Sequence, residues 1–204
     1  MDRGMVSSLS RKQEYARSND SADCGLHEYW DKVIFRETIL KGAYIIEPER
    51  KEDSRGFFAR VWCREEFLAK GLNAQLLQSN ISYNELKGTL RGMHYQVAPF
   101  AEVKLVRCTM GAIYDVIIDL RPQSSTYLQW VAGELSAEKR KILYVPEYFA
   151  HGYQTLVDDT EVSYQVSQFY TPDSEEGVRY DDPAFEIKWP FDVQNISDKD
   201  RSWP

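Results

Sequence analysis

The chain has 204 residues, of which 43% are hydrophobic and 28% charged, and its formal net charge is −7 at pH 7. This length suits one well-buried domain, and the composition excludes a globally disordered chain. The acidic charge argues against nucleic acid as a partner, because phosphate binding needs a basic surface. No apolar run approaches the roughly 18 residues needed to span a bilayer, and the polar N-terminus lacks the apolar segment of a secretory signal. We expect a cytoplasmic protein that binds neither nucleic acid nor membrane.

The first 30 residues are rich in Ser, Asp, Arg and Lys and show no hydrophobic periodicity. We predict that residues 1–30 form a flexible extension and that residues 31–204 form one domain. The three cysteines, Cys24, Cys63 and Cys108, are odd in number and widely spaced. This spacing indicates reduced thiols rather than a disulfide framework or a CxxC zinc site. Cys108 lies in an apolar alternation and is expected to be a core residue.

From Ile34 onward, short segments rich in β-branched and aromatic residues alternate with turn signals. Strands are predicted over residues 43–46, 56–62, 74–83, 88–96, 103–110, 112–120, 126–134, 142–145, 152–156 and 162–169, and short helices over 64–69 and 196–200, the latter with Ser197 as N-cap. The segments 104–110 and 112–120, joined at Gly111, give the clearest hairpin signal. Many short strands with little helix predict an all-β sandwich or closed barrel.

Two of the three histidines, His94 and His151, lie in apolar strand-like segments. A single buried histidine is usually structural, but Lys104, Asp115 and Tyr164 also fall in predicted strands. A barrel interior holding all five would be too polar for a passive core, since unpaired buried charges cost several kcal/mol each. We therefore expect a wet cavity. The third histidine, His27, stands in the polar N-terminal stretch and has no expected role.

Two chemistries fit a cavity that contains paired histidines. Metal binding needs about three protein ligands, and the residues two before and two after His94 are Gly92 and Gln96, so the second ligand is missing. Metal-free proton transfer needs a base, a cation to stabilise an enolate and an acid, which His94, Lys104 and Tyr164 supply by type. The residues favour the second chemistry.

The alternation of side chains along a strand raises a geometric question. It sends Arg91 and His94 to opposite faces of the predicted strand 88–96. Either Gly92 marks a β-bulge, or Arg91 serves another part of the pocket.

Seven blocks of the chain, in order, resemble the dTDP-4-dehydrorhamnose 3,5-epimerase family. They are the residues Ser-Arg-Gly-Phe-Phe at 54–58, Gln-Ser-Asn at 78–80, Leu-Arg-Gly-Met-His-Tyr-Gln at 90–96, Lys-Leu-Val-Arg at 104–107, Tyr-Asp-Val at 114–116, Val-Pro-Glu-Tyr-Phe-Ala-His-Gly at 145–152 and Trp-Pro at 189–190. The resemblance runs from about Ile46 to Asp200. Its specificity comes from the number and order of the blocks rather than from any one of them.

The resemblance implies a cupin-type jelly-roll β-barrel with short peripheral helices. It also implies a homodimer whose N-terminal strands cross to the partner, and a reaction without metal or other cofactor. The implied activity is inversion of C3, C5 or both in a nucleotide-linked 4-keto-6-deoxyhexose, of the type that converts dTDP-4-keto-6-deoxyglucose to dTDP-4-keto-rhamnose. A proton is removed and then returned to the opposite face of the carbon.

Catalytic roles follow from the same resemblance. His94 would be the base, oriented by Asp200, which matches the family's dyad aspartate near the C-terminus. Lys104 would stabilise the enolate, and Tyr164 would be the acid. Asp115 would orient a neighbouring side chain. The positions expected to contact substrate are Arg55, Phe58, Gln78, Asn80, Arg91, His151 and Tyr170.

The chain departs from the family pattern in the extension before about residue 34, which compact members lack, and at two places within the resemblance. Arg60 stands where many members carry a glutamate that contacts the nucleotide, and Glu102-Val103 replaces a small uncharged pair before Lys104. Three alternatives therefore remain beside the double epimerase. They are an epimerase that inverts one carbon or uses another nucleotide, a non-catalytic sugar-binding cupin, and a metal-dependent cupin.

Overall fold

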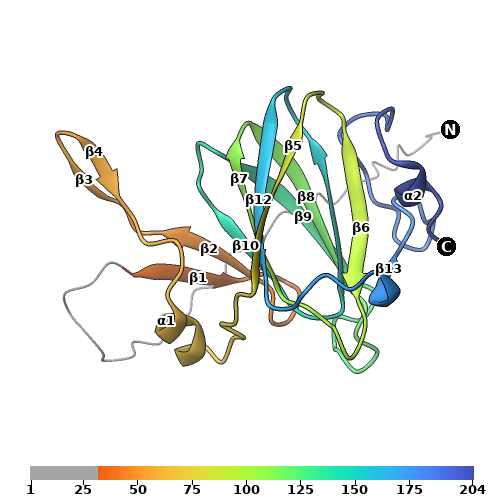
Figure 1. Ribbon diagram of the computed structural model, residues 1–204, viewed down its shortest axis with the longest axis horizontal. Helices are drawn as coiled ribbons and strands as arrows, with labels where there is room; N and C mark the ends of the chain where they lie inside the picture. Colours follow the sequence, from red (N-terminus) through yellow and green to blue (C-terminus); the bar gives the residue numbers. More distant parts are fainter. Residues whose placement is uncertain (1–31) are drawn as a thin grey trace, which may run out of the picture.

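The computed structural model describes residues 32–204, which form two antiparallel sheets packed face to face (Figure 1). The larger sheet has the order β1-β2-β10-β7-β12-β5, and the smaller sheet has the order β13-β6-β11-β8-β9. This arrangement is the all-β sandwich that the strand pattern predicted, and it has the cupin-type jelly-roll form that the family resemblance implied. The predicted extension 1–30, with Cys24 and His27, lies outside the described residues.

The strands of the larger sheet are β1 (Val33–Glu37), β2 (Tyr44–Pro48), β5 (Gln78–Asn84), β7 (Lys104–Met110), β10 (Ile142–Val145) and β12 (Thr160–Val166). Those of the smaller sheet are β6 (Leu90–Gln96), β8 (Ala112–Asp119), β9 (Trp130–Ser136), β11 (Phe149–Thr155) and β13 (Glu175–Gly177). The remaining elements are the hairpin strands β3 (Lys51–Asp53) and β4 (Gly56–Phe58), the helices α1 (Arg64–Ala69) and α2 (Asp198–Arg201), and the 3-10 turn η1 (Pro172–Ser174).

The main core lies between the two sheets. Val106 and Leu143 of the larger sheet and Ile117 and Leu135 of the smaller sheet are fully buried there. Cys108 joins this core as predicted, and burial raises the pKa of its thiol to about 11. Both Cys108 and Cys63 are free thiols. The core stops short of one end of the sandwich, where polar side chains replace apolar ones.

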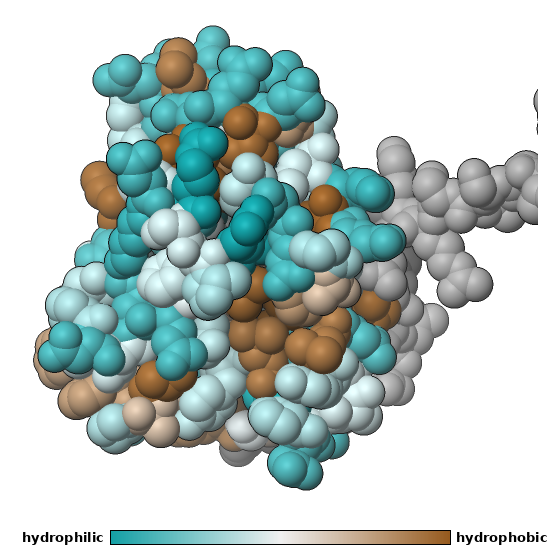
Figure 2. Space-filling view, turned by 90° about the vertical axis from the view of Figure 1, so that its right-hand side faces the viewer, coloured by the Kyte–Doolittle hydropathy of each residue, from teal (hydrophilic) through white to brown (hydrophobic). Residues whose placement is uncertain are grey.

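Each sheet also buries part of its outer face. Helix α1 places Phe67 on the larger sheet beside Ile46 and Tyr144. The chain after β13 covers the smaller sheet, where Phe185 packs with Val116 and other apolar residues. Figure 2 views this side of the molecule and shows hydrophobic side chains between largely hydrophilic ones. Within residues 32–204 no helix is long and apolar enough to cross a membrane.

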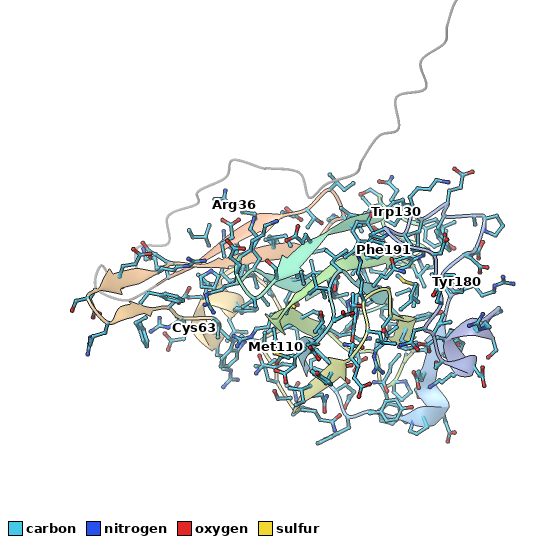
Figure 3. The ribbon with its side chains drawn as sticks, turned by 90° about the horizontal axis from the view of Figure 1, so that it is seen from above. Arg36, Cys63, Met110, Trp130, Tyr180 and Phe191 are labelled. Atoms are coloured by element: carbon cyan, nitrogen blue, oxygen red, sulfur yellow. The ribbon has the colours of Figure 1, made fainter. Side chains whose placement is uncertain are left out.

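The hairpin β3–β4 extends away from both sheets (Figures 1 and 3). Figure 3 shows Trp130, Tyr180 and Phe191 toward the opposite end of the molecule. The hairpin makes no ladder with either sheet, because β3 and β4 pair only with each other among the described strands.

One predicted pairing is wrong. β7 and β8 do not form a hairpin, because β7 pairs with β10 and β12 in the larger sheet whereas β8 pairs with β11 and β9 in the smaller one. Gly111 alone separates them, with φ of +75°, and a Cβ there would lie 2.4 Å from Oγ1 of Thr160. One residue is too short for the usual two-residue hairpin turn, so the chain crosses between sheets instead.

Several predicted boundaries also move. The predicted strand 56–62 ends at Phe58, and the predicted strand 74–83 begins only at Gln78. The strands β1, β3 and β13 lay outside the predicted set; β3 and β13 have three residues each and are polar, whereas β1, of five residues, directly follows the polar N-terminal stretch. Helix α1 has the predicted bounds, and α2 begins after Ser197, whose Oγ accepts a hydrogen bond from the backbone N–H of Asp200.

Candidate active site

A cavity of about 550 Å³ opens at the polar end of the sandwich, between the two sheets and α2. Nine of the eleven residues predicted for the site line it, and they come from both sheets and the C-terminal segment. These are Gln78, Asn80, Arg91, His94, Lys104, His151, Tyr164, Tyr170 and Asp200. The cavity predicted to hold His94, Lys104, His151 and Tyr164 is therefore present, whereas Asp115, which was predicted with them, is not among its lining residues.

A bulge in β6 brings Arg91 and His94 to the same cavity. His94 pairs with His151 of β11, and Arg91 pairs with Tyr153. An advance of three residues along β6 therefore corresponds to two residues along β11. Gly92 stands inside this irregularity with φ of +127°, and a Cβ there would lie 2.4 Å from Cα of Gly152. Only glycine allows the two strands to approach so closely.

The base candidate His94 contacts an aspartate brought by the C-terminal segment. Its Nε2 lies 2.6 Å from Oδ1 of Asp200. The second oxygen, Oδ2, accepts a hydrogen bond from the backbone N–H of Gly92 at 3.2 Å. Ser197 caps α2 and so fixes the turn that carries the aspartate. The His94 side chain is 30% exposed, so the ring remains open to the cavity.

The surroundings of Asp200 keep its carboxylate charged. Burial raises the pKa of Asp200, but the hydrogen bond and charge of His94 and the Gly92 N–H outweigh it, so the pKa lies below its usual value. An ionised carboxylate accepts hydrogen bonds only. The His94 Nε2 therefore carries the proton that faces this carboxylate, and proton exchange with a substrate falls to Nδ1.

Lys104 stands beside the base at the start of β7. Its Nζ donates to the backbone oxygen of His94 at 3.1 Å and lies 3.3 Å from Oε1 of Glu102. Both charged side chains are nearly buried, with 13% exposure for Lys104 and 11% for Glu102. The ammonium is therefore held at the cavity wall close to the strand that carries His94.

Tyr164 lies on β12, which pairs with both β7 and β5. It is opposite Val106 on one side and Asn80 on the other. Burial, with a smaller effect from Glu102, raises the pKa of Tyr164, although Arg91 opposes the shift. A tyrosine that keeps its proton at neutral pH can act as a general acid.

His151 forms a second histidine–aspartate pair deeper in the fold. Its Nε2 lies 2.9 Å from Oδ2 of Asp115, which confirms that Asp115 orients a neighbour. Asp115 is fully buried, and its Oδ1 has no hydrogen-bond partner among the described residues. Burial raises the pKa of Asp115, with His151 and Lys104 opposing.

The mouth of the cavity is built from polar contacts between loops and strands. Arg91 donates from Nε to Oδ1 of Asn84 at 2.7 Å. The Tyr170 hydroxyl donates to Oε2 of Glu175 at 2.6 Å, and Gln78 accepts from the Tyr170 backbone N–H at 2.8 Å. The hydrogen bond to Glu175 raises the pKa of Tyr170.

Arg55 and Phe58 are not brought to this cavity. They lie on the β3–β4 hairpin, where Phe58 is 64% exposed and Arg55 pairs with Asp53 at 2.5 Å. Arg60 follows the hairpin and lies 3.1 Å from Glu66 of α1.

Sequence reasoning assigned no cavity role to several lining residues, among them Ser82, Glu102, Tyr153 and Glu175. The alternation along 74–83 and 162–169 could have identified Ser82, whereas Glu175 lies in an unpredicted strand. Residues 32–204 contain no group of three or more His, Cys, Asp or Glu side chains that could hold a metal ion. Absence of a cofactor stays a prediction.

Comparisons with known proteins agree on one family. The family model described as dTDP-4-dehydrorhamnose 3,5-epimerase matches residues 37–204. A dTDP-4-dehydrorhamnose 3,5-epimerase from Sinorhizobium fredii is 41% identical over 85% of this chain and 90% of its own. The crystal structure of a dTDP-4-dehydrorhamnose 3,5-epimerase from Bacillus anthracis, with TDP and PPi bound, has a TM-score of 0.82 and 40% identity, covering 85% of this chain and 99% of its own. A 3,5-epimerase from Legionella pneumophila, in complex with dTDP-4-keto-L-rhamnose, has a TM-score of 0.77 and 34% identity, covering 83% and 90%.

Proposed function

The chain belongs to the dTDP-4-dehydrorhamnose 3,5-epimerase family, and we propose that its cavity inverts C3 and C5 of dTDP-4-keto-6-deoxyglucose without a cofactor. The observation that carries the proposal is the 2.6 Å contact between His94 and Asp200, on a wall shared with Lys104 and near Tyr164. A protein that only binds sugars has no need of an oriented base beside a buried ammonium. The arrangement therefore favours catalysis over binding alone.

The substrate supplies its own electron sink in this reaction. A C4 ketone acidifies the hydrogens on C3 and C5, and removal of either gives an enolate. His94 takes the proton at the nitrogen that Asp200 leaves free, and the Lys104 ammonium stabilises the charge that develops on the ketone oxygen. Tyr164 returns a proton to the other face of the carbon, which inverts it. His94 must then release its proton, and the Tyr164 phenolate must regain one, before the second carbon reacts.

Binding roles are assigned to five of the remaining residues that line the cavity. Arg91, Gln78 and Asn80 offer a guanidinium and two amides to the nucleotide diphosphate and the sugar, and His151 and Tyr170 complete the same set.

Proton NMR of dTDP-4-keto-6-deoxyglucose in D2O with the protein tests this proposal. Deuterium at both C3 and C5, with inversion at both, is the expected result. Label at one carbon alone would identify a single-carbon epimerase. No exchange by folded protein that still binds dTDP would identify a non-catalytic binder, and no binding of dTDP would point to another nucleotide.

We also propose that the chain forms a homodimer in which the β3–β4 hairpin of one protomer reaches the cavity of the other. Three features support this arrangement: the hairpin projects from the fold, it exposes Phe57 and Phe58, and Ile81 is 67% exposed on β5 (Figure 1). Exposed aromatic side chains on a projecting hairpin are typical of interaction sites. Arg55 and Phe58 would then contact substrate in the partner's cavity.

Subunit mixing tests this arrangement. Arg55→Ala and His94→Ala are each expected to be impaired, but a refolded equimolar mixture should regain activity in about a quarter of its sites, because half the dimers are mixed and each has one intact site. A mixture no more active than its parents, with exchange of subunits shown by mass spectrometry, would place Arg55 elsewhere.

A further inference from the structure

Glu102 is a cavity residue that the proposed reaction does not use. It precedes β7 and places a nearly buried carboxylate two residues before Lys104. A carboxylate held away from water costs several kcal/mol unless its oxygens find partners. The partners of Glu102 therefore indicate what this residue is for.

The contacts of Glu102 leave it with spare acceptor capacity. Oε1 lies 3.3 Å from Nζ of Lys104, and Oε2 lies 3.3 Å from Nε2 of Gln96. The Gln96 amide has two hydrogens but faces three acceptors, since the backbone oxygens of Phe100 and Phe169 lie 3.0 and 3.3 Å away. A carboxylate accepts about four hydrogen bonds, so two long contacts leave room for a further donor.

Lys104 has spare capacity to donate a hydrogen bond. Within residues 32–204 its Nζ contacts the backbone oxygen of His94 and the carboxylate of Glu102. An ammonium has three hydrogens, so one is free for a ligand. The cavity wall therefore presents a donor and an acceptor side by side, with their heavy atoms 3.3 Å apart.

An α-hydroxyketone presents the complementary pair, a ketone oxygen that accepts and a hydroxyl on the next carbon that donates. We propose that Lys104 binds the C4 ketone oxygen and Glu102 accepts a hydrogen bond from the C3 hydroxyl. This inference rests on the proposed function, which puts the ketone oxygen at Lys104. C5 cannot supply the donor, because its oxygen is the ring oxygen and carries no hydrogen. Glu102 is thus a specificity-determining residue that selects 4-keto sugars with a hydroxyl at C3 over 3-deoxy sugars.

Calorimetric binding in a His94→Ala background tests the inference, because that variant should convert its ligands about 10²–10⁴-fold more slowly. The two ligands are dTDP-4-keto-6-deoxyglucose and its 3-deoxy analogue. Adding Glu102→Ala should weaken binding of the hydroxylated sugar by about 10- to 100-fold, the usual effect of losing a hydrogen bond to a charged group. The 3-deoxy analogue should bind with nearly unchanged affinity. Glu102→Gln should fall between, since an amide oxygen still accepts.

A role confined to holding Lys104 would weaken both ligands equally, and that result would overturn the inference. Unchanged binding of the hydroxylated sugar after Glu102→Ala would also overturn the inference. So would failure of the His94→Ala protein to bind either sugar. Glu175→Ala is the matched control, because it removes a cavity carboxylate bonded to Tyr170 and Lys199 instead. It should leave the ratio of the two affinities unchanged. Wild-type protein that shows the Glu102-dependent preference but no exchange in D2O would refute the proposed function and keep this inference.

Discussion

His94 and His151 are neighbours across β6 and β11, and each contacts an aspartate through Nε2, at 2.6 and 2.9 Å. Asp200 reaches its histidine from a capped helical turn and collects a second donor from Gly92, so its pKa lies below the usual value. Asp115 comes from inside the smaller sheet, leaves Oδ1 without a partner among the described residues, and has a raised pKa because it is buried.

The same two side-chain types thus have different chemical capacities in one cavity. A carboxylate with several donors stays charged and stabilises an imidazolium, so His94 is suited to take and release protons. The buried pair has a rigid geometry and little access to solvent, with His151 only 10% exposed on its side chain. That pair is suited to hold a substrate group in a fixed place. The environment, rather than the residue pair, separates the two roles.

The largest expected effect compares the two histidines directly. His94→Ala should slow deuterium uptake by about 10²–10⁴-fold, the usual contribution of a positioned base. His151→Ala should cost about 10-fold, chiefly as weaker binding, because it removes one hydrogen bond. NMR exchange rates at saturating and limiting substrate separate the two effects. If the exchange rate at saturating substrate fell more in His151→Ala than in His94→Ala, His151 would be the base and His94 the binding group.

Gly92→Ala should disturb both pairs together. A Cβ there would meet backbone atoms of Gly152 and His151, at 2.4 and 2.8 Å, so we expect the free energy of unfolding to fall by about 3 kcal/mol or more. Gly56→Ala is the control, because Gly56 has nearly the same φ, +129°, but nothing lies within 4 Å of its Cβ position. It should cost about 1–2 kcal/mol. Equal losses in urea unfolding would mean that φ alone, rather than the close approach of β6 and β11, requires Gly92.

The two pairs also show how far the sequence could be interpreted. Strand alternation and the family blocks predicted His94, His151, Lys104 and Tyr164 in one cavity, because a period of two fixes which side chains share a face. The assignment of Asp200 to His94 depended on resemblance. Nothing local in the chain shows that a four-residue helix more than 100 positions later closes on β6.

Other features could not be predicted from the sequence, because they depend on contacts between distant segments. The apolar pattern on both sides of Gly111 is the same for a hairpin and for strands in opposite sheets, and the difference lies in the distant partners, β10 and β12 for β7 and β11 and β9 for β8. Glu102 departs from the family pattern, but its contact with Gln96 at the end of β6 depends on how the connection between β6 and β7 folds back. Placement of Arg55 and Phe58 in a partner's cavity stays a prediction.

Tyr164→Phe tests the assignment of the general acid. Loss of the hydroxyl should slow inversion by about 10- to 100-fold while slowing deuterium uptake less, because the acid acts after proton abstraction. The matched control is Tyr153→Phe, which removes a buried hydroxyl bonded to Ser82 and Asn84 beside the His151 ring. It should change inversion and uptake together and only slightly. If Tyr153→Phe instead separated the two rates, the acid would lie on the His151 side.

The smallest effect is the pH dependence of stability, and its sign should differ between the two aspartates. The pKa of Asp200 is lowered in the folded state, so its stabilising contribution is present above the unfolded value of about 3.9 and is lost as the pH falls through the folded pKa. The pKa of Asp115 is raised, so its contribution is greatest below about pH 3.9 and is lost as the pH rises through the folded pKa.

Urea unfolding of wild type, Asp200→Asn and Asp115→Asn between pH 3 and pH 7 measures both contributions. On acidification, the free energy of unfolding that wild type has in excess of Asp200→Asn should shrink. Over the same pH range, wild type should gain stability relative to Asp115→Asn. Parallel changes in the two variants would show that the two pairs share one electrostatic environment, and the separation of base from binding group would then need another cause.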